Sequence, residues 1–464
     1  MKMIIRFKQF LRQYWAPLII AVVINSIVLV NTILHHPKIG YDVTSHLTNI
    51  QIYPIRFPTP QDSSEFFSAP LSYLLPSLYD KICVYYLPAK ANVQVACRGA
   101  DGRVAQVINL LLSIGITLIF WKIAERLKPG SVSLKVSILS MLGILTVYYR
   151  TFSQARGEPY IAFFISLVML QILDMLLRPQ DAGWKSNLKL GFSLGLLILS
   201  RQWGFFIFPA LGLLALVILL KDKAAGWRFI RGLLISGVVA FVVGGWFYLH
   251  LYFTYGSFTT FNINSPGFSI FNQPPSFYFG TGLKNLLLFK TPVRPAFDRS
   301  WMPVFYSDIW GDYWCYFTCV INVTAPGMSL NREQISPYLG RVNLVSLFPS
   351  LLLLAGAGLG LFSLVRSFRR AKYDPLTVFA GFVFAVVVFS WLGYMVFLIS
   401  FPGNPLTNKA TYLIQVFMAL AVLGGMLLEK LKERKPLLFH LCILGLGLVF
   451  IHNLPAMFTH FHWV

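Results

Sequence analysis

The stretch Val378–Ile399 reads VFAGFVFAVVVFSWLGYMVFLI and contains no charged residue. A bilayer core about 30 Å thick needs about 20 consecutive apolar residues per helix, and backbone in lipid must satisfy its own hydrogen bonds. This stretch therefore predicts a transmembrane helix. A second run of the same kind is Phe205–Leu220, FFIFPALGLLALVILL.

The composition of the 464-residue chain extends this conclusion to the whole protein. Charged residues make up 12% and apolar residues 56%, whereas soluble domains carry roughly 25% charged residues. The formal net charge of +22 would favour a nucleic-acid partner in a soluble protein. Here Lys and Arg gather in short segments between apolar runs, which is the positive-inside pattern of membrane proteins. We therefore exclude nucleic acid as a partner.

The hydropathy pattern predicts an all-α polytopic membrane protein of about eleven transmembrane helices. The predicted spans are 16–34, 104–121, 133–149, 159–177, 189–200, 204–220, 232–253, 342–365, 376–400, 411–428 and 437–455. The first span has no small-residue cleavage site and is interpreted as an uncleaved helix. Residues 190–220 would form one helix of about 46 Å, so we predict two short helices that turn at Arg201, with a re-entrant pair as the alternative.

The charges orient these spans and divide the chain. Basic segments alternate with the others, and the rule places the basic set and the N-terminus in the cytoplasm. The predicted divisions are 1–34 with the first helix, an external loop 35–103, helices in 104–253, a second large external loop 254–341, and helices in 342–464. Within the first loop, 43–53 and 71–87 are amphipathic and are predicted to lie on the membrane surface.

Four of the five cysteines fall in the external loops, where disulfides are permitted. They are Cys83, Cys97, Cys315 and Cys319, while Cys442 lies in a span. A Cys83–Cys97 bridge and a Cys315–Cys319 bridge both stay open at this stage.

Asp42 is placed just after the first span, at the start of a predicted helix. It can cap that helix or act as a general base at the water–lipid boundary. His46 lies four residues on and shares a helix face with Asp42. It is either a hydrogen-bonding partner or, with Asp42, a ligand for a divalent metal.

Short motifs in order along the chain resemble the GT-C superfamily of membrane glycosyltransferases, in particular the protein O-mannosyltransferase and lipid A aminoarabinose-transferase branch. The likeness covers residues 40 to about 412. The motifs are Tyr41-Asp42-x-x-x-His46, then Pro70-Leu71-x-Tyr73-Leu74-Leu75, Arg156-Gly157-Glu158, Gly191-x-x-x-Gly195 leading to Ser200-Arg201-Gln202, and Lys409-Ala410-x-Tyr412.

The resemblance implies an inverting glycosyltransferase whose donor is a sugar on a polyprenyl phosphate. Asp42 would deprotonate an acceptor hydroxyl, on a glycan, lipid or protein, at the external membrane face. Positive charge would bind the donor phosphate, and Arg201, Lys409 and Arg156 are the candidates. Glu158 would orient the acceptor or balance the charge of Arg156, and His46 is the second candidate for an acceptor or acid partner. Whether Asp42, His46 and Glu158 bind a divalent metal stays an open question, because these residues are possible ligands but the first loop has no Asp-x-Asp motif.

A second dense cluster, Phe305–Trp314, interleaves aromatic and acidic side chains. Aromatic faces pack on sugar rings and carboxylates bind sugar hydroxyls, so Tyr306, Asp308, Trp310 and Asp312 are predicted to bind sugar. The alternative is an aromatic belt at the membrane interface.

Two other functions stay open. A transporter or flippase for a lipid-linked saccharide would show inverted repeats and charged groups near the bilayer midplane, and we find no repeat. A polysaccharide polymerase or ligase would use a lipid-diphosphate donor, and arginines in a large external loop would carry it. Such arginines are Arg294, Arg299, Arg332 and Arg341.

Overall fold

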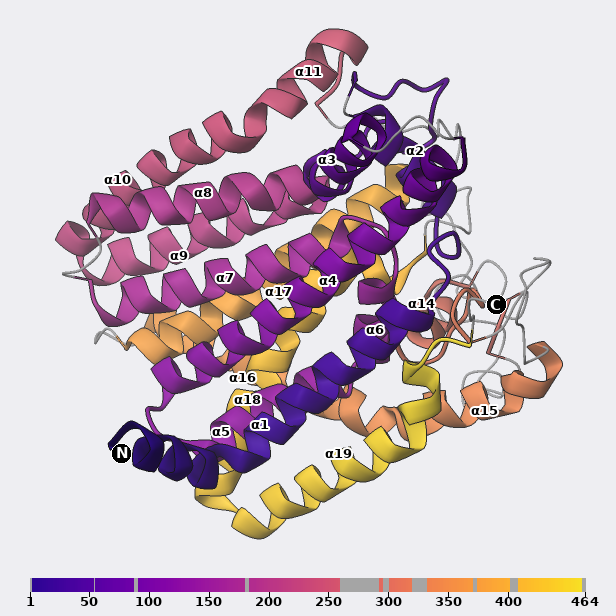
Figure 1. Cartoon of the computed structure of the whole chain (residues 1–464). Coiled ribbons are helices and arrows are strands. Elements are labelled where there is room, and N and C mark those ends of the chain that lie inside the picture. The colour runs from indigo at the N-terminus through magenta and orange to yellow at the C-terminus, as the bar shows by residue number, and fades with distance from the viewer. Residues whose placement is uncertain are drawn as a thin grey trace.

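A computed structural model describes residues 2–53, 55–86, 91–179, 183–258, 292–294, 300–318, 332–369, 374–400 and 408–460. Within these ranges all regular structure is helical, as predicted (Figure 1). The elements are α1 (Lys2–Leu34), α2 (Val43–Ile52), α3 (Leu71–Tyr86), α4 (Ala91–Leu127), α5 (Val132–Gly143), α6 (Thr146–Ser153), α7 (Glu158–Leu177), α8 (Trp184–Ser200), η1 (Gln202–Phe206), α9 (Ile207–Lys221), α10 (Lys223–Ala240), a π-helical turn η2 (Phe241–Gly245), α11 (Trp246–Tyr255), α14 (Trp301–Trp310), α15 (Arg332–Val345), α16 (Leu347–Arg369), α17 (Pro375–Ser400), η5 (Ala410–Leu413), α18 (Ile414–Arg434) and α19 (Pro436–Met457).

The number of membrane-spanning helices is close to the prediction. In the described part of the chain nine helices are long and apolar enough to cross a bilayer, and the bent pair α5 and α6 makes a tenth. The remaining predicted span, 189–200, lies in α8, whose 17 residues give a helix of about 26 Å, shorter than a typical crossing. The chain is an integral multi-pass membrane protein.

The predicted span 133–149 is not one straight helix. The structure bends it by 64° between α5 and α6, so the prediction of a continuous helix there was wrong. Leu145 is extended at the bend (φ −74°, ψ 102°), and this backbone cannot continue the helical ladder. The Tyr149 hydroxyl donates to the carbonyl of Gly143 (2.7 Å) and satisfies one group freed by the break.

The predicted turn at Arg201 is confirmed. α8 ends at Ser200, and Arg201 is fully extended (φ −166°, ψ 156°) before η1 leads into α9. Gly204 permits the tight return, because a Cβ there would lie 2.6 Å from the carbonyl oxygen of Leu197. The predicted amphipathic segments of the first loop are the helices α2 and α3.

Helix α18 forms the centre of the bundle. It packs against α5, α7, α16, α17 and α19, and 89% of its most apolar stretch is buried. Glycines allow the backbones to meet, since a Cβ on Gly356 of α16 would lie 2.7 Å from the amide nitrogen of Gly424. Small residues at helix contacts are typical of membrane bundles.

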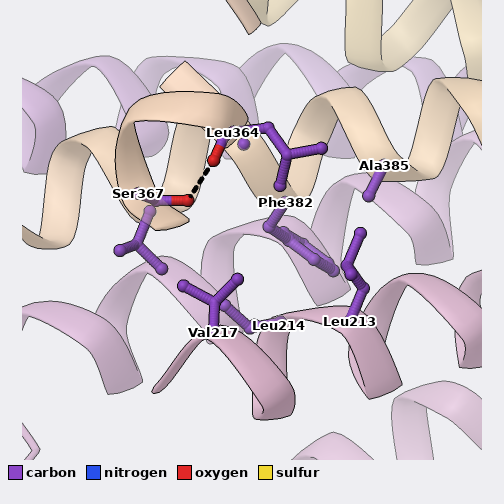
Figure 2. A pocket seen from close by; sticks show the side chains of 9 residues that line it. Leu213, Leu214, Val217, Leu364, Ser367, Phe382 and Ala385 are labelled. Atoms are coloured by element: carbon purple, nitrogen blue, oxygen red, sulfur yellow. Dashed lines mark hydrogen bonds between the residues drawn. The ribbon is translucent and has the colours of Figure 1, made fainter. Parts of the chain in front are cut away.

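The outer helices pack almost as closely. Figure 2 shows the contact of α9, α16 and α17, where Leu213, Val217, Leu364 and Phe382 surround a space of about 10 Å³. That is near the minimum for one water molecule. The polar Ser367 hydroxyl donates to the carbonyl of Leu364 in its own helix (2.6 Å). This region therefore supports the bundle and offers no reactive group to a substrate.

The two ends of the bundle differ in character. At one end cations of the predicted cytoplasmic segments form pairs such as Lys128–Glu429 (2.8 Å) and Arg126–Asp174 (2.5 Å). The other end carries α2, α3, α14 and α15 (Figure 1), and Asp42 lies there at the start of α2. We call it the Asp42 end.

The cysteines agree in part with the sequence-based prediction. Cys83 and Cys315 are each disulfide-bonded. Their predicted partners cannot be compared, because the side chain of Cys97 and all of Cys319 lie outside the described residues. Cys442 is a buried free thiol.

Candidate active site

The backbone around Asp42 directs its carboxylate away from the helix that follows. Gly40 has φ +149°, and a Cβ there would lie 2.8 Å from the side chain of Gln154. Asp42 occupies the N-cap position of α2 in the left-handed region (φ 54°), and its side chain makes no capping hydrogen bond. The helix-cap interpretation of Asp42 is therefore wrong. A non-glycine residue at positive φ is uncommon and clusters at functional sites.

The partner of Asp42 is Lys409, which lies 367 positions later in the chain. The Lys409 ammonium donates to Asp42 Oδ2, and its Nζ also lies 3.3 Å from the hydroxyl of Tyr412. The side chain of Lys409 is 4% exposed, whereas that of Asp42 is 33% exposed. Burial opposes ionisation, but the Lys409 charge and hydrogen bond hold the pKa of Asp42 below its ordinary value. Asp42 is thus an ionised carboxylate that solvent can reach.

Beneath this pair, four buried side chains alternate in charge. Glu158 accepts two hydrogen bonds from Arg156 (2.6 and 2.8 Å) and one from Arg201 (3.2 Å). Arg201 also donates to Glu65 (2.7 Å). We call Arg156, Glu158, Arg201 and Glu65 the charge ladder. Burial opposes the charged form of Glu65, but Arg201 lowers its pKa below the ordinary value.

A glycine brings the two halves of the ladder together. A Cβ on Gly157 would lie 2.5 Å from the carbonyl oxygen of Ser200 and 2.9 Å from Cγ of Arg201. The start of α7 therefore touches the turn after α8 backbone to backbone. This contact places Glu158, the first residue of α7, within hydrogen-bonding distance of Arg201.

Two tyrosines join the ladder to the Asp42–Lys409 pair. The Arg156 guanidinium carbon lies 5.4 Å from the ring centre of Tyr41 and 5.6 Å from that of Tyr412. Lys409 Nζ lies 5.3 and 5.4 Å from the same two rings. Such distances allow cation–π attraction. One guanidinium nitrogen of Arg156, Nη1, is buried without a hydrogen-bond acceptor in the described part of the chain.

His46 lies behind Asp42 as a neutral side chain. It is fully buried, its Nδ1 is 2.7 Å from the Tyr73 hydroxyl, and its ring stacks on Tyr73. Burial lowers the pKa of His46 to about 4. The hydrogen-bonding partner of His46 is thus Tyr73, and its predicted role beside Asp42 stays a prediction.

The three residues considered for a metal do not fit one. No group of three His, Cys, Asp or Glu side chains in the described residues could hold a metal ion. Both carboxylate oxygens of Glu158 accept hydrogen bonds from Arg156, so they face guanidinium groups. We derive no step that uses a metal.

The predicted sugar-binding cluster is largely turned inward. Asp308 and Asp312 are each 1% exposed. Asp312 Oδ2 accepts hydrogen bonds from the backbone of Phe317 and Thr318 (2.8 and 2.7 Å). Trp310 is buried, and the half-buried Tyr306 donates to the carbonyl of Asn343 (2.9 Å). Sugar binding by these four residues stays a prediction.

Sequence reasoning missed several members of the site. Glu65 and Tyr41 had no assigned role, and Tyr412 was only part of a motif. Arg201 offered a signal, because an arginine inside an apolar stretch needs a buried partner. The first external loop supplies that partner as Glu65. Arg150, which contacts α14, gave no such signal.

Comparison with known proteins supports the fold. No family model and no curated protein sequence matches the chain. Among solved structures, the Archaeoglobus fulgidus oligosaccharyltransferase in complex with Zn and sulfate aligns over 95% of this chain and 53% of its own, with 16% identity and a TM-score of 0.50. The oligosaccharyltransferase AglB of the same organism, solved with an inhibitory peptide and a dolichol-phosphate, aligns over 97% and 56%, with 15% identity and a TM-score of 0.50.

The chain shares the fold of these two oligosaccharyltransferase structures. ArnT from Cupriavidus metallidurans bound to undecaprenyl phosphate aligns over 94% of this chain and 63% of that one, with 14% identity and a TM-score of 0.48. The chain thus spans 53 to 63% of the length of these three proteins. At such identities the likeness concerns the fold alone, and chemistry has to be argued from the site itself.

Proposed function

We propose that this protein is an inverting glycosyltransferase that moves a monosaccharide from a polyprenyl-phosphate donor to an acceptor hydroxyl. The observation that carries the proposal is the Asp42–Lys409 pair, in which a solvent-reachable carboxylate lies against a buried ammonium. The Asp42 carboxylate can accept a proton, and the Lys409 ammonium can bind a phosphate. The dolichol-phosphate present in AglB supports a lipid-phosphate donor.

Asp42 acts as the general base. Its carboxylate accepts the proton of the acceptor hydroxyl as the hydroxyl oxygen attacks the anomeric carbon from the face opposite the phosphate. The bond between the anomeric carbon and the phosphate oxygen breaks, and the electron pair leaves with the lipid phosphate. One substitution at the anomeric carbon inverts its configuration.

Lys409 and Arg156 bind the donor phosphate. Lys409 lies beside the base, and Arg156 keeps Nη1 without an acceptor in the described residues. Groups aimed at the leaving oxygen stabilise the charge that develops there. Arg201 adds positive charge from deeper in the ladder, where Glu65 and Glu158 already hold it.

Binding of the donor phosphate changes the balance of charge around Asp42 and thereby prepares Asp42 for catalysis. The site holds three carboxylates, Asp42, Glu65 and Glu158, and three cations, Lys409, Arg156 and Arg201. A phosphate that takes a share of Lys409 weakens its hold on Asp42. The pKa of Asp42 then rises toward its ordinary value, and the carboxylate becomes a better proton acceptor.

Glu158 and His46 support the site from behind. Both are fully buried. Glu158 orients Arg156 and Arg201, and His46 joins α2, the helix that follows Asp42, to Tyr73 of α3. We place the site on the external face, because the paired cations of the predicted cytoplasmic segments lie at the opposite end of the bundle.

A reconstituted transfer assay tests the proposal. Purified protein in nanodiscs receives a panel of radiolabelled polyprenyl-phosphate sugars and a native membrane extract, with a lipid-diphosphate saccharide as a separate arm. Asp42→Asn should lower the rate about 10²- to 10⁴-fold, the contribution of a general base. Asp62→Asn is the matched control, since Asp62 is another carboxylate of the first loop that pairs with a cation (2.6 Å to Arg56).

The outcomes separate the candidate functions. Transfer by the unaltered protein and by Asp62→Asn, but not by Asp42→Asn, supports both the reaction and the base. Normal turnover by Asp42→Asn refutes the base. Transfer only from the lipid diphosphate, or no turnover of any donor by well-folded protein, contradicts the proposed donor and favours the polymerase or transporter.

A further inference from the structure

Asp308 lies at a junction between three segments that are distant in sequence. Its Oδ1 accepts a hydrogen bond from the Tyr41 hydroxyl (2.7 Å), and its Oδ2 accepts one from the backbone amide of Ala410 (2.7 Å). Tyr41 directly precedes Asp42, and Ala410 directly follows Lys409. The two oxygens of one carboxylate thus hold the chain neighbours of the base and of its ammonium partner.

Helix α14 makes Asp308 a firm support. The Arg150 guanidinium of α6 donates to the carbonyl of Asp308 and contacts that of Ile309 (3.4 Å), both at the C-terminal end of α14. Cations stabilise that end of a helix. The same guanidinium lies 4.0 Å from Asp308 Oδ1 and 3.7 Å from Asp312 Oδ1. Asp308 is therefore buried with a counter-charge beside it, and its position is fixed by the bent helix α6.

We propose that Asp308 is a positioning residue that holds Asp42 and Lys409 in register, through its hydrogen bonds to Tyr41 and Ala410. It does not touch the reacting atoms. Both oxygens of Asp308 accept hydrogen bonds from the protein, and the residue is 1% exposed. This inference uses the proposed function only in treating Asp42 and Lys409 as the catalytic pair.

The register matters because the pair is built from two loops. Asp42 follows α1, and Lys409 precedes η5. A misplacement of about 1 Å can cost 10²-fold in rate. This clamp of two hydrogen bonds joins the segment that holds Asp42 at positive φ to the extended backbone of Lys409 (φ −121°, ψ 124°).

Tyr41→Phe is the sharpest variant, because it removes the hydroxyl and keeps the ring that faces Arg156 and Lys409. Asp308→Ala removes both hydrogen bonds. The matched control is Tyr148→Phe, which deletes another buried tyrosine hydroxyl, bonded to Ser113 (2.8 Å), on the same helix as Arg150. Hydrogen bonds to charged groups are worth enough to predict a fall in kcat of about 10- to 100-fold for Tyr41→Phe.

Tyr41→Phe and Asp308→Ala should change different kinetic parameters. Tyr41→Phe loosens only the Asp42 side, so kcat falls while the donor KM stays unchanged. Asp308→Ala loosens both sides, so kcat falls and the donor KM rises. In the double variant the loss of the Tyr41 hydroxyl adds nothing further, because its acceptor is already gone.

A second readout does not depend on turnover. Acylation of Lys409 by a water-soluble amine reagent is followed by mass spectrometry, with the exposed Lys38 as internal reference. Asp42→Asn, which breaks the ion pair, gives the upper limit of the rate. Tyr41→Phe and Asp308→Ala should each raise the Lys409 rate about fivefold or more, as expected for a pair weakened by about 1 kcal/mol, and Tyr148→Phe should leave it unchanged.

These measurements distinguish the two proposals. If the unaltered protein transfers no sugar, the proposed function fails, and the acylation rates still decide the clamp. If Tyr41→Phe matches Tyr148→Phe in both kcat and Lys409 acylation, the clamp is overturned. If Asp308→Ala does not fold, the comparison of Tyr41→Phe with Tyr148→Phe is sufficient to support or overturn it.

Discussion

Replacing Glu158 by glutamine tests whether the charge ladder holds the protein together. Glu158 is fully buried and accepts three charge-assisted hydrogen bonds, two from Arg156 and one from Arg201. Glutamine keeps one acceptor oxygen and turns an amide N–H toward a guanidinium donor. Arg156 then loses the one carboxylate that pairs with it among the described residues, and Arg201 keeps only Glu65. Breaking a buried ion pair in this way costs about 3–5 kcal/mol.

That cost corresponds to an unfolding equilibrium constant raised by roughly 10² to 10⁴, at 1.4 kcal/mol for each tenfold. The assay is reversible unfolding of the purified protein by SDS in mixed micelles, followed by tryptophan fluorescence. Glu433→Gln is the control, since Glu433 also pairs with a cation, Lys128, but both side chains are about half exposed (54% and 46%). An exposed pair of this kind is worth about 0–1 kcal/mol.

The double variant Arg156→Gln with Glu158→Gln removes one charge of each sign and leaves Arg201 paired with Glu65. Its loss should be smaller than the sum of the two single losses by about 1–3 kcal/mol, as neighbours in one network behave. If Glu158→Gln lies within about 1 kcal/mol of Glu433→Gln, the ladder does not act as a buried unit and the reasoning is refuted.

Three further variants test other features. The pKa of His46 is lowered to about 4 in the folded state, so between about pH 6.5 and 4 the unfolded chain binds a proton at His46 and the folded chain does not. The free energy of unfolding should therefore fall by about 2 kcal/mol from pH 7 to 5. An equal fall in the His46→Gln variant would contradict this. Gly157→Ala forces a Cβ to within 2.5 Å of the Ser200 oxygen and should cost about 1–3 kcal/mol, whereas Gly212→Ala, with open space around it, should be neutral or stabilising in the same SDS titration. Phe382→Ala, beside the small cavity of Figure 2, should cost about 3–5 kcal/mol in that titration, and a loss below about 1 kcal/mol would show that the contact of α9, α16 and α17 is loose.

Most of the fold follows from hydropathy because a bilayer imposes it. Runs such as Val378–Ile399 have one stable conformation in lipid, and α17 covers this run in full. The interruption at Arg201 located the turn between α8 and α9 for the same reason. The 64° bend between α5 and α6 escaped prediction, because 133–149 contains no proline and its only glycine, Gly143, sits inside an apolar run.

The sequence predicted the individual charged residues of the candidate site, but it did not predict which of them form ion pairs with each other. Asp42, Lys409, Arg156, Glu158 and Arg201 all carry charges at predicted external helix ends, so each could be found singly. Which carboxylate meets which cation depends on contacts between segments hundreds of residues apart, such as Asp42 with Lys409. Local patterning does not encode such contacts, and the burial of Asp308 and Asp312 could not be inferred from their aromatic neighbours.

The burial of α18 also constrains how the protein is made. A ribosome synthesises this helix after α5, α7, α16 and α17, yet in the finished molecule these helices surround it. The apolar surface of α18 would partition readily into lipid, but in the folded protein this helix is buried among other helices. The contacts between α18 and these helices therefore form only after all of them have been synthesised. Because η5 leads directly into α18, the packing of α18 also brings Lys409 to Asp42, and the pair depends on the placement of this late helix.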